Sequence, residues 1–422
     1  MKIDSLKSFL DNSPSAYHAV AALEEKLAEA GYTGLRQSEN WELTPGGKYY
    51  VNQGGSALFA FRIPEGEPAG FMMSAAHCDR PAFKLKENGE LRAKYTRLST
   101  EKYGGMLIST WLDRPLSLAG RVMVETENGV QSKLLNIDKD LLLIPNVSIH
   151  MNRGVNDGYK WNPAVDTLPL MGTGSMGSKL ESILEEAAGG KILGHDLYLY
   201  VRQKATVWGA EEEFISAQGL DDLACVWGCA EGFLNAQDSA AVPVLCVFDN
   251  EEVGSATIQG AGSTGLIDLL SRICACHGWE LNRLLATSFM VSADNAHALH
   301  PNHPELSDAA NAPVLGGGVV IKFHGDHRYT TDGLSAALFR KLCGDAPLQT
   351  FYNRADMPSG STLGTISVSQ VAVMSVDIGL PQLAMHSAYE TAAVKDAGYL
   401  ADAMTAYYGK SLYPTDGGYV IA

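Results

Sequence analysis

The sequence contains no long apolar run. Among its 422 residues, no stretch of about 18 or more consecutive apolar residues occurs, so we expect no membrane-spanning helix. The first residues, Met1-Lys2-Ile3-Asp4-Ser5, lack the apolar segment of a secretory signal peptide. We therefore expect a cytoplasmic protein that does not act at a membrane.

Clusters of basic residues are also missing. The 32 lysines and arginines stand against 48 aspartates and glutamates, which gives a formal net charge of −16. Such a surface repels nucleic acid and anionic lipid, so we exclude both as main partners. The charge of the whole chain says little about a small-substrate pocket, whose local charge can differ.

Cysteine is scarce as well. The chain has 7 cysteines, an odd number, and most lie inside apolar runs. This indicates reduced core thiols of a cytosolic protein rather than a disulfide framework. The sequence Cys274-Ala275-Cys276 could form a redox or metal pair, but it falls in a helical pattern, so we favour a packing role for it.

Two kinds of sequence alternate along the chain. Residues 1–81 and 209–422 mix helical patterns with short β-branched runs, whereas residues 82–208 show short alternating runs and many turns. We predict an α/β fold in which a discontinuous mixed-sheet α/β/α catalytic domain is interrupted by a β-rich inserted domain at 82–208. No internal repeat or low-complexity tract occurs.

The periodicity also predicts individual elements. We expect helices at about 4–30, 178–188, 221–235, 265–279, 334–342 and 394–408. We expect strands at 48–52, 57–62, 70–76, 242–248, 287–293 and 370–376. In the first helix, Ser13 and Pro14 are interpreted as the N-cap and first helical residue. The Gly-rich loop at 171–177 lacks the Lys-Ser/Thr pair of a phosphate-binding loop.

The most informative stretch is Asp249-Asn250-Glu251-Glu252, which follows the predicted buried strand 242–248. In an open α/β sheet, ligands bind at the carboxyl ends of strands. Adjacent glutamates repel each other unless a cation lies near them. A divalent metal explains the pair if one glutamate is a ligand and the other takes a proton from metal-bound water. The alternative is a solvated acidic turn.

Further potential ligands stand where predicted strands end or a helix begins: His77, Asp79, Asp221, Asp294 and His386. Two imidazoles with several carboxylates suit one or two zinc-like ions. Asp79 also suits a carboxylate that holds the ring of a metal-bound His77. Each residue has a structural alternative: His77 as a hydrogen-bonded core histidine, Asp221 as a helix N-cap, Asp294 as a turn cap, and His386 as a strand end.

Several segments together resemble the signature blocks of the aspartyl aminopeptidase family, which are dinuclear zinc aminopeptidases of the yeast vacuolar aminopeptidase I type. The matching segments are residues 76–81, 110–122, 144–153, 219–223, 248–255, 292–302 and 382–387. They follow one another in the family's order over nearly the whole chain. The family fold has a catalytic α/β domain interrupted by a β-rich domain used in assembly.

The resemblance implies a role for each candidate residue. It implies two zinc ions with these ligands: Asp221 between both ions, His77 and Asp294 on one, Glu252 and His386 on the other. Glu251 is implied as the general base, and Asp79 as the residue that orients His77. Where the family often has asparagine after the bridging aspartate, this chain has Asp222, so spacing leaves open which aspartate bridges.

The resemblance also implies substrate contacts. Lys322 and Tyr329 match family positions that contact the substrate's side chain, and His297 lies in a matching block. His150 matches the block whose histidine crosses the dimer interface into a neighbouring active site. The alternatives are a surface lysine whose stem covers apolar surface and an ordinary surface histidine. Family members assemble as tetrahedral dodecamers built from dimers.

We therefore expect an aminopeptidase that removes the N-terminal residue from peptides with a free amine, with a preference for Asp or Glu. One alternative is an aminopeptidase that prefers neutral residues, because an arginine found in the family after His386 and Ser387 is missing here. Another is a dinuclear deacylase or carboxypeptidase of the same fold. A non-catalytic scaffold is disfavoured because Glu251 is retained.

Overall fold

The structure is a computed structural model that describes residues 2–174 and 179–422. The chain divides into two compact units. Unit 1 comprises Met1–Asp79, Thr206–Met385 and Glu390–Ala422, and unit 2 comprises Arg80–Ala205 and His386–Tyr389. Two places where the chain passes between the units, after Asp79 and before Thr206, lie within three residues of the ends predicted for the inserted domain.

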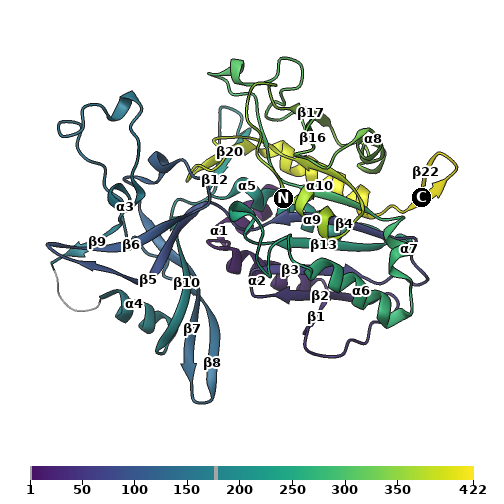
Figure 1. Cartoon of the computed structure of the whole chain (residues 1–422), viewed down its shortest axis with the longest axis horizontal. Helices are drawn as coiled ribbons and strands as arrows, with labels where there is room; N and C mark the ends of the chain where they lie inside the picture. Colours follow the sequence, from purple (N-terminus) through teal and green to yellow (C-terminus); the bar gives the residue numbers. More distant parts are fainter. Residues whose placement is uncertain (1, 175–178) are drawn as a thin grey trace. The chain divides into compact units, whose positions relative to one another are not determined.

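Unit 1 is built on a nine-stranded mixed sheet (Figure 1). Its order is β1 (Thr33–Leu35), β2 (Lys48–Gln53), β3 (Ala57–Arg62), β13 (Val242–Phe248), β4 (Phe71–His77), β14 (Phe289–Ala293), β18 (Met374–Gly379), β16 (Val319–Phe323) and β17 (Leu348–Tyr352). The central strands β13, β4, β14 and β18 run parallel, whereas β3 and β16 pair antiparallel to their inner neighbours. Every residue of β3, β4, β13 and β14 is buried, as expected of strands covered on both faces.

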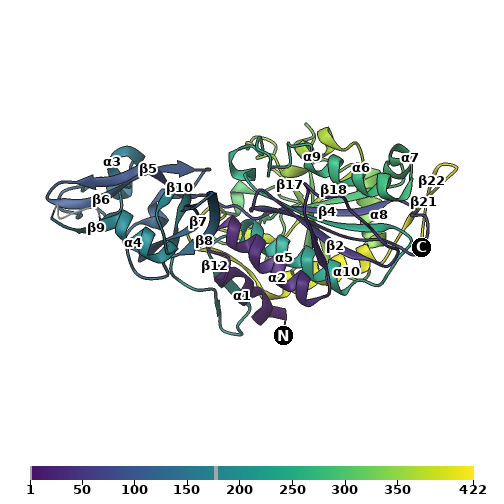
Figure 2. The ribbon, with the colours of Figure 1, turned by 90° about the horizontal axis from the view of Figure 1, so that it is seen from below.

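Helices cover both faces of this sheet (Figure 2). On one face lie α6 (Gly265–His277), α7 (Leu281–Leu285) and α9 (Leu363–Gln370), whose apolar side chains join one core with the sheet. On the other face lie α1 (Lys2–Asp11), α2 (Ala16–Glu29), α5 (Leu220–Asn235), α8 (Gly333–Leu342) and α10 (Val394–Tyr408). The predicted α/β/α arrangement is therefore confirmed.

A smaller five-stranded sheet belongs to the same unit. Its order is β11 (Thr206–Trp208), β12 (Phe214–Ala217), β20 (Glu390–Ala393), β19 (Pro381–Leu383) and β15 (Ala296–His297). Its strands β15 and β19 follow β14 and β18 in the chain, and β20 leads directly into α10. A hairpin of β21 (Leu412–Thr415) and β22 (Gly418–Ile421) follows α10.

Unit 2 is β-rich. Its six strands are all antiparallel, in the order β8 (Gly129–Asn136), β7 (Leu116–Thr126), β10 (Ile192–Val201), β5 (Ala82–Arg92), β6 (Tyr95–Tyr103) and β9 (Leu170–Thr173). Within the described part of this unit, the α-helices α3 (Pro163–Asp166) and α4 (Lys179–Ala188) accompany the strands. The unit has its own apolar core, in which Phe83 packs edge-on against Trp111.

Some predicted elements differ from the structure. The expected helix at 4–30 is two helices, and the N-cap of the second is Ser15 rather than Ser13. The strand expected at 370–376 begins only at Met374, because α9 continues to Gln370. Part of the Gly-rich loop at 171–177 and the first residue of the helix predicted at 178–188 lie outside the described residues.

The structure bears on two expectations from composition. Cys274 is buried, as a packing role requires, whereas Cys276 is exposed, so the packing role holds for Cys274 alone. All seven cysteines are thiols without a disulfide. Among the described residues, no helix combines the length and apolar character needed to cross a membrane.

Candidate metal centre

The candidate ligands meet at the carboxyl edge of the nine-stranded sheet. In register, Phe248 at the end of β13 pairs with His77 at the end of β4. Residues 249–252 therefore begin beside His77. Asp294 directly follows β14, the next strand along the sheet. Parallel pairing brings together residues that are far apart in the sequence.

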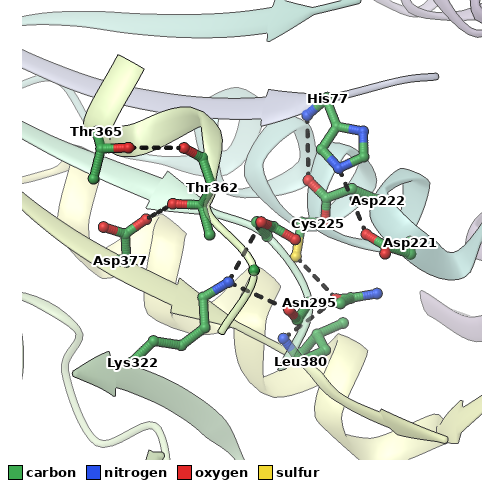
Figure 3. Close-up of polar contacts among 12 residues, drawn as sticks. His77, Asp221, Asp222, Cys225, Asn295, Lys322, Thr362, Thr365, Asp377 and Leu380 are labelled. Atoms are coloured by element: carbon green, nitrogen blue, oxygen red, sulfur yellow. Dashed lines mark hydrogen bonds and ion pairs between the residues drawn. The ribbon is translucent and has the colours of Figure 1, made fainter. Parts of the chain in front are cut away.

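The first ligand group comprises His77, Asp221 and Asp294. All three side chains are buried, and one ligand atom from each lies within 4.8 Å of the others. Figure 3 shows the His77 ring directed at Asp221, with Nε2 3.5 Å from Oδ1. Burying two carboxylates this close is costly without a cation between them, and imidazole and carboxylate are donors that zinc accepts.

The second ligand group comprises Asp221, Glu252 and His386, again with one ligand atom from each within 4.8 Å of the others. Asp221 is the one residue that belongs to both groups. His386 lies in the short loop between β19 and β20. The donor set of each group, one imidazole and two carboxylates, fits a divalent metal such as zinc.

Asp79 belongs to neither ligand group but contacts His77 and the two glutamates. Its Oδ1 lies 3.3 Å from Nδ1 of His77, and its backbone carbonyl oxygen lies 3.2 Å from the same atom. The two oxygens of its carboxylate accept the backbone N–H groups of Glu251 and Glu252, at 3.1 and 3.2 Å. Asp79 therefore fixes both the tautomer of the histidine and the short turn that carries the two glutamates.

The site strongly disfavours the charged forms of its carboxylates. Burial raises the pKa of Glu251 to about 7; the charges of Asp294, Asp79 and Asp221 act in the same direction, and His77 acts against them. Burial first, and neighbouring carboxylates second, raise the pKa of Glu252 well above its usual value. Mutual repulsion of this kind is the electrostatic environment that a divalent cation relieves.

The structure distinguishes Asp221 from Asp222. Asp221 belongs to both ligand groups, whereas Asp222 belongs to neither. Asp222 is fully buried, and its Oδ2 accepts the backbone N–H of His77 at 3.2 Å. Asp221 and Asp222 have non-helical backbone angles at the start of α5, so the regular turns of the helix begin after them, and Asp221 contributes its side chain to the ligand groups from this kink.

Lys322 is buried, with 2% of its surface exposed. Its Nζ lies 3.5 Å from Oδ2 of Asp294, donates to the carbonyl oxygen of Asn295 at 3.3 Å, and lies 5.1 Å from the ring centroid of the buried Tyr329. Burial alone would lower the pKa of this lysine, but Asp294 and other nearby groups raise it. The alternative of an exposed surface lysine is therefore wrong.

The remaining two candidates are exposed. His297 ends β15, with its ring 6.3 Å from that of Phe351. His150 lies in a turn of unit 2.

Sequence reasoning missed two residues that organise the site. The side chain of Asn295 donates to the carbonyl oxygen of Leu220 at 2.8 Å and to Oε1 of Gln382 at 2.7 Å, and so connects the start of α5 to β19. Asp377, in the middle of β18, is fully buried. The signal that could have found it is a single acidic residue between two apolar ones, Val376 and Ile378.

A mixed sheet whose carboxyl edge gathers imidazoles and carboxylates in this way defines a metal-dependent hydrolase. The family model described as aminopeptidase I zinc metalloprotease (M18) matches residues 9–408. The chain belongs to this M18 family of metal-dependent aminopeptidases, as its sequence motifs indicated.

Individual relatives agree with this assignment. A probable M18 family aminopeptidase 2 of Clostridium acetobutylicum is 41% identical over 96% of this chain and 97% of its own length. One of Pseudomonas paraeruginosa is 38% identical over 97% and 98%. Among solved structures, the Ape4 and Nbr1 complex matches with a TM-score of 0.92 at 33% identity, covering 97% of this chain and 85% of that one. The crystal structure of prApe1 matches with a TM-score of 0.91 at 25% identity, covering 96% and 94%.

Proposed function

We propose that this aminopeptidase uses a dinuclear zinc centre and prefers peptides with an acidic first residue. The observation that carries the metal count is the sharing of Asp221 between two ligand groups. His77 and Asp294 would complete the shell of one ion, and Glu252 and His386 that of the other. A carboxylate that belongs to two ligand groups supports a two-metal site.

Bound zinc would supply a water of lowered pKa and would polarise the peptide carbonyl group. Glu251 belongs to neither ligand group, so its carboxylate is left for proton transfer. It takes the proton of the attacking water and returns it to the leaving amine. Asp79 holds the Glu251 backbone at a fixed distance from the His77 ring, which keeps the base beside the ligands.

The substrate's free α-amine, a cation at neutral pH, is attracted by the carboxylates around the site, and an acetylated amine lacks this charge. Lys322 supports the preference for an acidic first residue, because it is a buried cation whose Nζ lies 3.5 Å from Asp294. The Tyr329 ring, 5.1 Å from Nζ of Lys322, supports a role for this tyrosine in the same proposed side-chain pocket. His297 and His150 are further proposed substrate contacts.

Assembly and location extend the proposal. The structure of the yeast relative mApe1, with a TM-score of 0.85 at 25% identity, is described as a dodecamer. We propose a homo-oligomer of the same kind, a tetrahedral dodecamer built from dimers, with residues 82–208 as the domain used in assembly. We also propose that the enzyme works in the cytoplasm, a reducing compartment that suits its seven free thiols.

The test compares a peptide that has a free N-terminal Glu with its N-acetylated twin, using protein whose zinc content is measured on the same sample. We expect cleavage of the free-amine peptide alone and about two zinc ions per chain. Glu251→Gln should keep the zinc and lose about 10²–10⁴-fold in kcat. Cleavage of only the acetylated peptide would instead identify a deacylase. Loss of zinc in Glu251→Gln would exchange the roles of Glu251 and Glu252.

A further inference from the structure

Asp377 is a buried carboxylate that the mechanism above does not use. It lies in the middle of β18 with none of its surface exposed. In the parallel pairing of β18 with β14, it stands beside Ser292, two residues before the ligand Asp294. A buried aspartate is costly unless its oxygens are hydrogen-bonded, so its partners indicate what it is there to hold.

One carboxylate oxygen holds the segment that follows Tyr329. Oδ2 accepts the backbone N–H of Thr330 at 2.6 Å and the hydroxyl group of the same residue at 2.7 Å. The backbone N–H of Asp377 donates to Oγ1 of Thr331 at 2.8 Å. The hydroxyl group of Thr331 also donates to the carbonyl oxygen of Asp377, at 3.5 Å. Residues 330 and 331 are thus held to β18 by four hydrogen bonds, two of which involve a carboxylate and are therefore stronger than neutral ones.

The other oxygen holds the start of α9. Oδ1 accepts the hydroxyl group of Thr362, the N-cap residue of that helix, at 2.7 Å (Figure 3). The close approach depends on Gly364, since a Cβ atom at that position would lie 2.6 Å from Oδ1. One carboxylate therefore joins the loop after Tyr329, the strand β18 and the first turn of α9.

The loop that Asp377 holds contains Tyr329, whose ring lies beside Lys322. Tyr329, the residue directly before Thr330, is buried and lies 5.1 Å from Nζ of Lys322. Asp377 therefore holds, through Thr330, the loop whose tyrosine lies beside the Lys322 ammonium group.

We propose that Asp377 is a positioning residue that sets the selectivity of this enzyme for the first side chain of its substrate, by fixing Tyr329 beside Lys322. The inference rests on the proposed function, because it assumes that these two residues line the side-chain pocket. It predicts an effect on KM for acidic substrates that is separate from the hydrolytic step.

The kinetic test compares Asp377→Ala with the isosteric Asp377→Asn on peptides that begin with Glu or Leu. The alanine removes the acceptors of Thr330, whereas the asparagine keeps an oxygen for Thr330 and can donate to Thr362. Since the lost bonds involve a charged group, we expect Asp377→Ala to raise KM for the Glu peptide by about tenfold or more, with a smaller rise for the Leu peptide. We expect kcat to change by less than about threefold, because the water-activating groups are untouched. Asp377→Asn should recover most of the loss. Thr362→Val, which removes only the bond to α9, should leave KM near that of the wild type.

A double-mutant cycle with Lys322→Met tests whether the KM effect of Asp377→Ala depends on Lys322. If Asp377 acts through Lys322 and Tyr329, Asp377→Ala should cause little further loss in the Lys322→Met background, because contacting residues are not additive. An additive loss, or an equal fall in kcat for both peptides, would overturn the proposal and leave Asp377 as a structural residue.

Amide hydrogen exchange supplies a readout that does not depend on turnover. In Asp377→Ala, the amide of Thr330 should exchange faster than in the wild type, whereas amides of the buried strand β13 should not change. An inactive wild-type enzyme would refute the proposed function. The exchange data would still show whether Asp377 holds the Thr330 segment. An active wild type with unchanged selectivity in all variants would refute the inference alone. If Asp377→Ala does not fold, Thr330→Val, which removes one of the bonds to Oδ2, carries the same comparison.

Discussion

Lys322 shows how much a single residue's meaning depends on its surroundings. The apolar residues before it are compatible with a surface strand, yet the side chain is fully enclosed and lies beside Asp294, Asn295 and Tyr329. A buried ammonium group needs charged or polar partners, and this one has them. The proposed preference for an acidic first residue assigns this charge to the substrate's carboxylate.

Replacing Lys322 with methionine tests that role directly. The variant keeps the shape of the stem and removes the charge, so we expect kcat/KM for Glu and Asp peptides to fall by about 10–100-fold more than for a Leu peptide. Zinc content must be measured in parallel, because Asp294 loses a cationic neighbour. An equal fall for all three peptides, or none, would show that Lys322 does not determine specificity.

At the scale of elements, the pair α5 and α10 depends on two small residues. A Cβ atom at Gly232 would lie 2.3 Å from Cβ of Met404 and 2.7 Å from its backbone carbon, so α10 leaves no room for a side chain there. At Gly228 the neighbour is the side chain of Leu400, which can shift more easily. Since α5 begins at the metal ligands, this packing also supports the site.

Gly232→Ala should therefore destabilise the protein. Forced overpacking in a close helix contact costs about 1–3 kcal/mol. Gly398→Ala on α10 is the matched control: a Cβ atom there meets nothing within 4 Å, so helix propensity should make it neutral or stabilising by up to about 1 kcal/mol. Thermal unfolding of the two variants compares them. A Gly232→Ala variant as stable as Gly398→Ala would show that α10 moves aside.

Asp396 connects α10 to the Gly-rich segment before β16. Its two oxygens accept the backbone N–H groups of Gly316 at 2.7 Å and Gly318 at 2.9 Å. Burial raises its pKa from 3.8 to about 6, although these two hydrogen bonds act in the opposite direction. The folded protein therefore holds this proton more tightly than the unfolded chain does.

The sign of the resulting pH dependence follows from linkage. Because the pKa is higher in the folded state, the favourable contribution of Asp396 is complete below the unfolded pKa and is lost as the pH rises to about 6. Relative to Asp396→Asn, the wild type should lose free energy of unfolding between about pH 4 and pH 6. Denaturant unfolding of both proteins at several pH values measures this. Parallel curves would mean that the pKa of Asp396 is the same in both states.

At the scale of the whole molecule, the proposed oligomer gives His150 a possible role across subunits. His150 is exposed in a turn of unit 2, so its imidazole is available to a second copy of the chain. A donor that reaches a developing oxyanion is worth about 10²–10³ in kcat. An ordinary surface histidine is the alternative.

Complementation separates these two roles. Purified His150→Ala and Glu251→Gln should each be nearly inactive, and mixing after dissociation and reassembly should restore part of the activity. In a mixed dimer, one intact Glu251 site receives an intact His150 from its neighbour. A labelled-subunit control must show that chains exchange. Confirmed exchange without recovery would mean that His150 serves its own subunit or none.

Local sequence patterns predicted the bounds of several elements, the metal chemistry of the acidic stretch, and the family. The strands at 242–248 and 57–62 and the helix at 394–408 have the predicted bounds. A strand buried on both faces gives a continuous apolar run, and a helix buried along one face gives apolar residues at helical spacing. The acidic stretch after residue 248 pointed to metal chemistry for a local reason, the repulsion of adjacent carboxylates. Motif resemblance then named the family that the comparisons confirm.

Tertiary structure decided what depends on contacts between distant residues. The pairing of distant strands brings His77 and Asp294 together and buries Lys322. The kink at the start of α5 places Asp221, and not Asp222, in the ligand groups. A sequence period reports which face of an element is covered, but not which element covers it. Asp377 and Asn295 were missed for the same reason, since their hydrogen-bond partners lie 15 to 87 residues away.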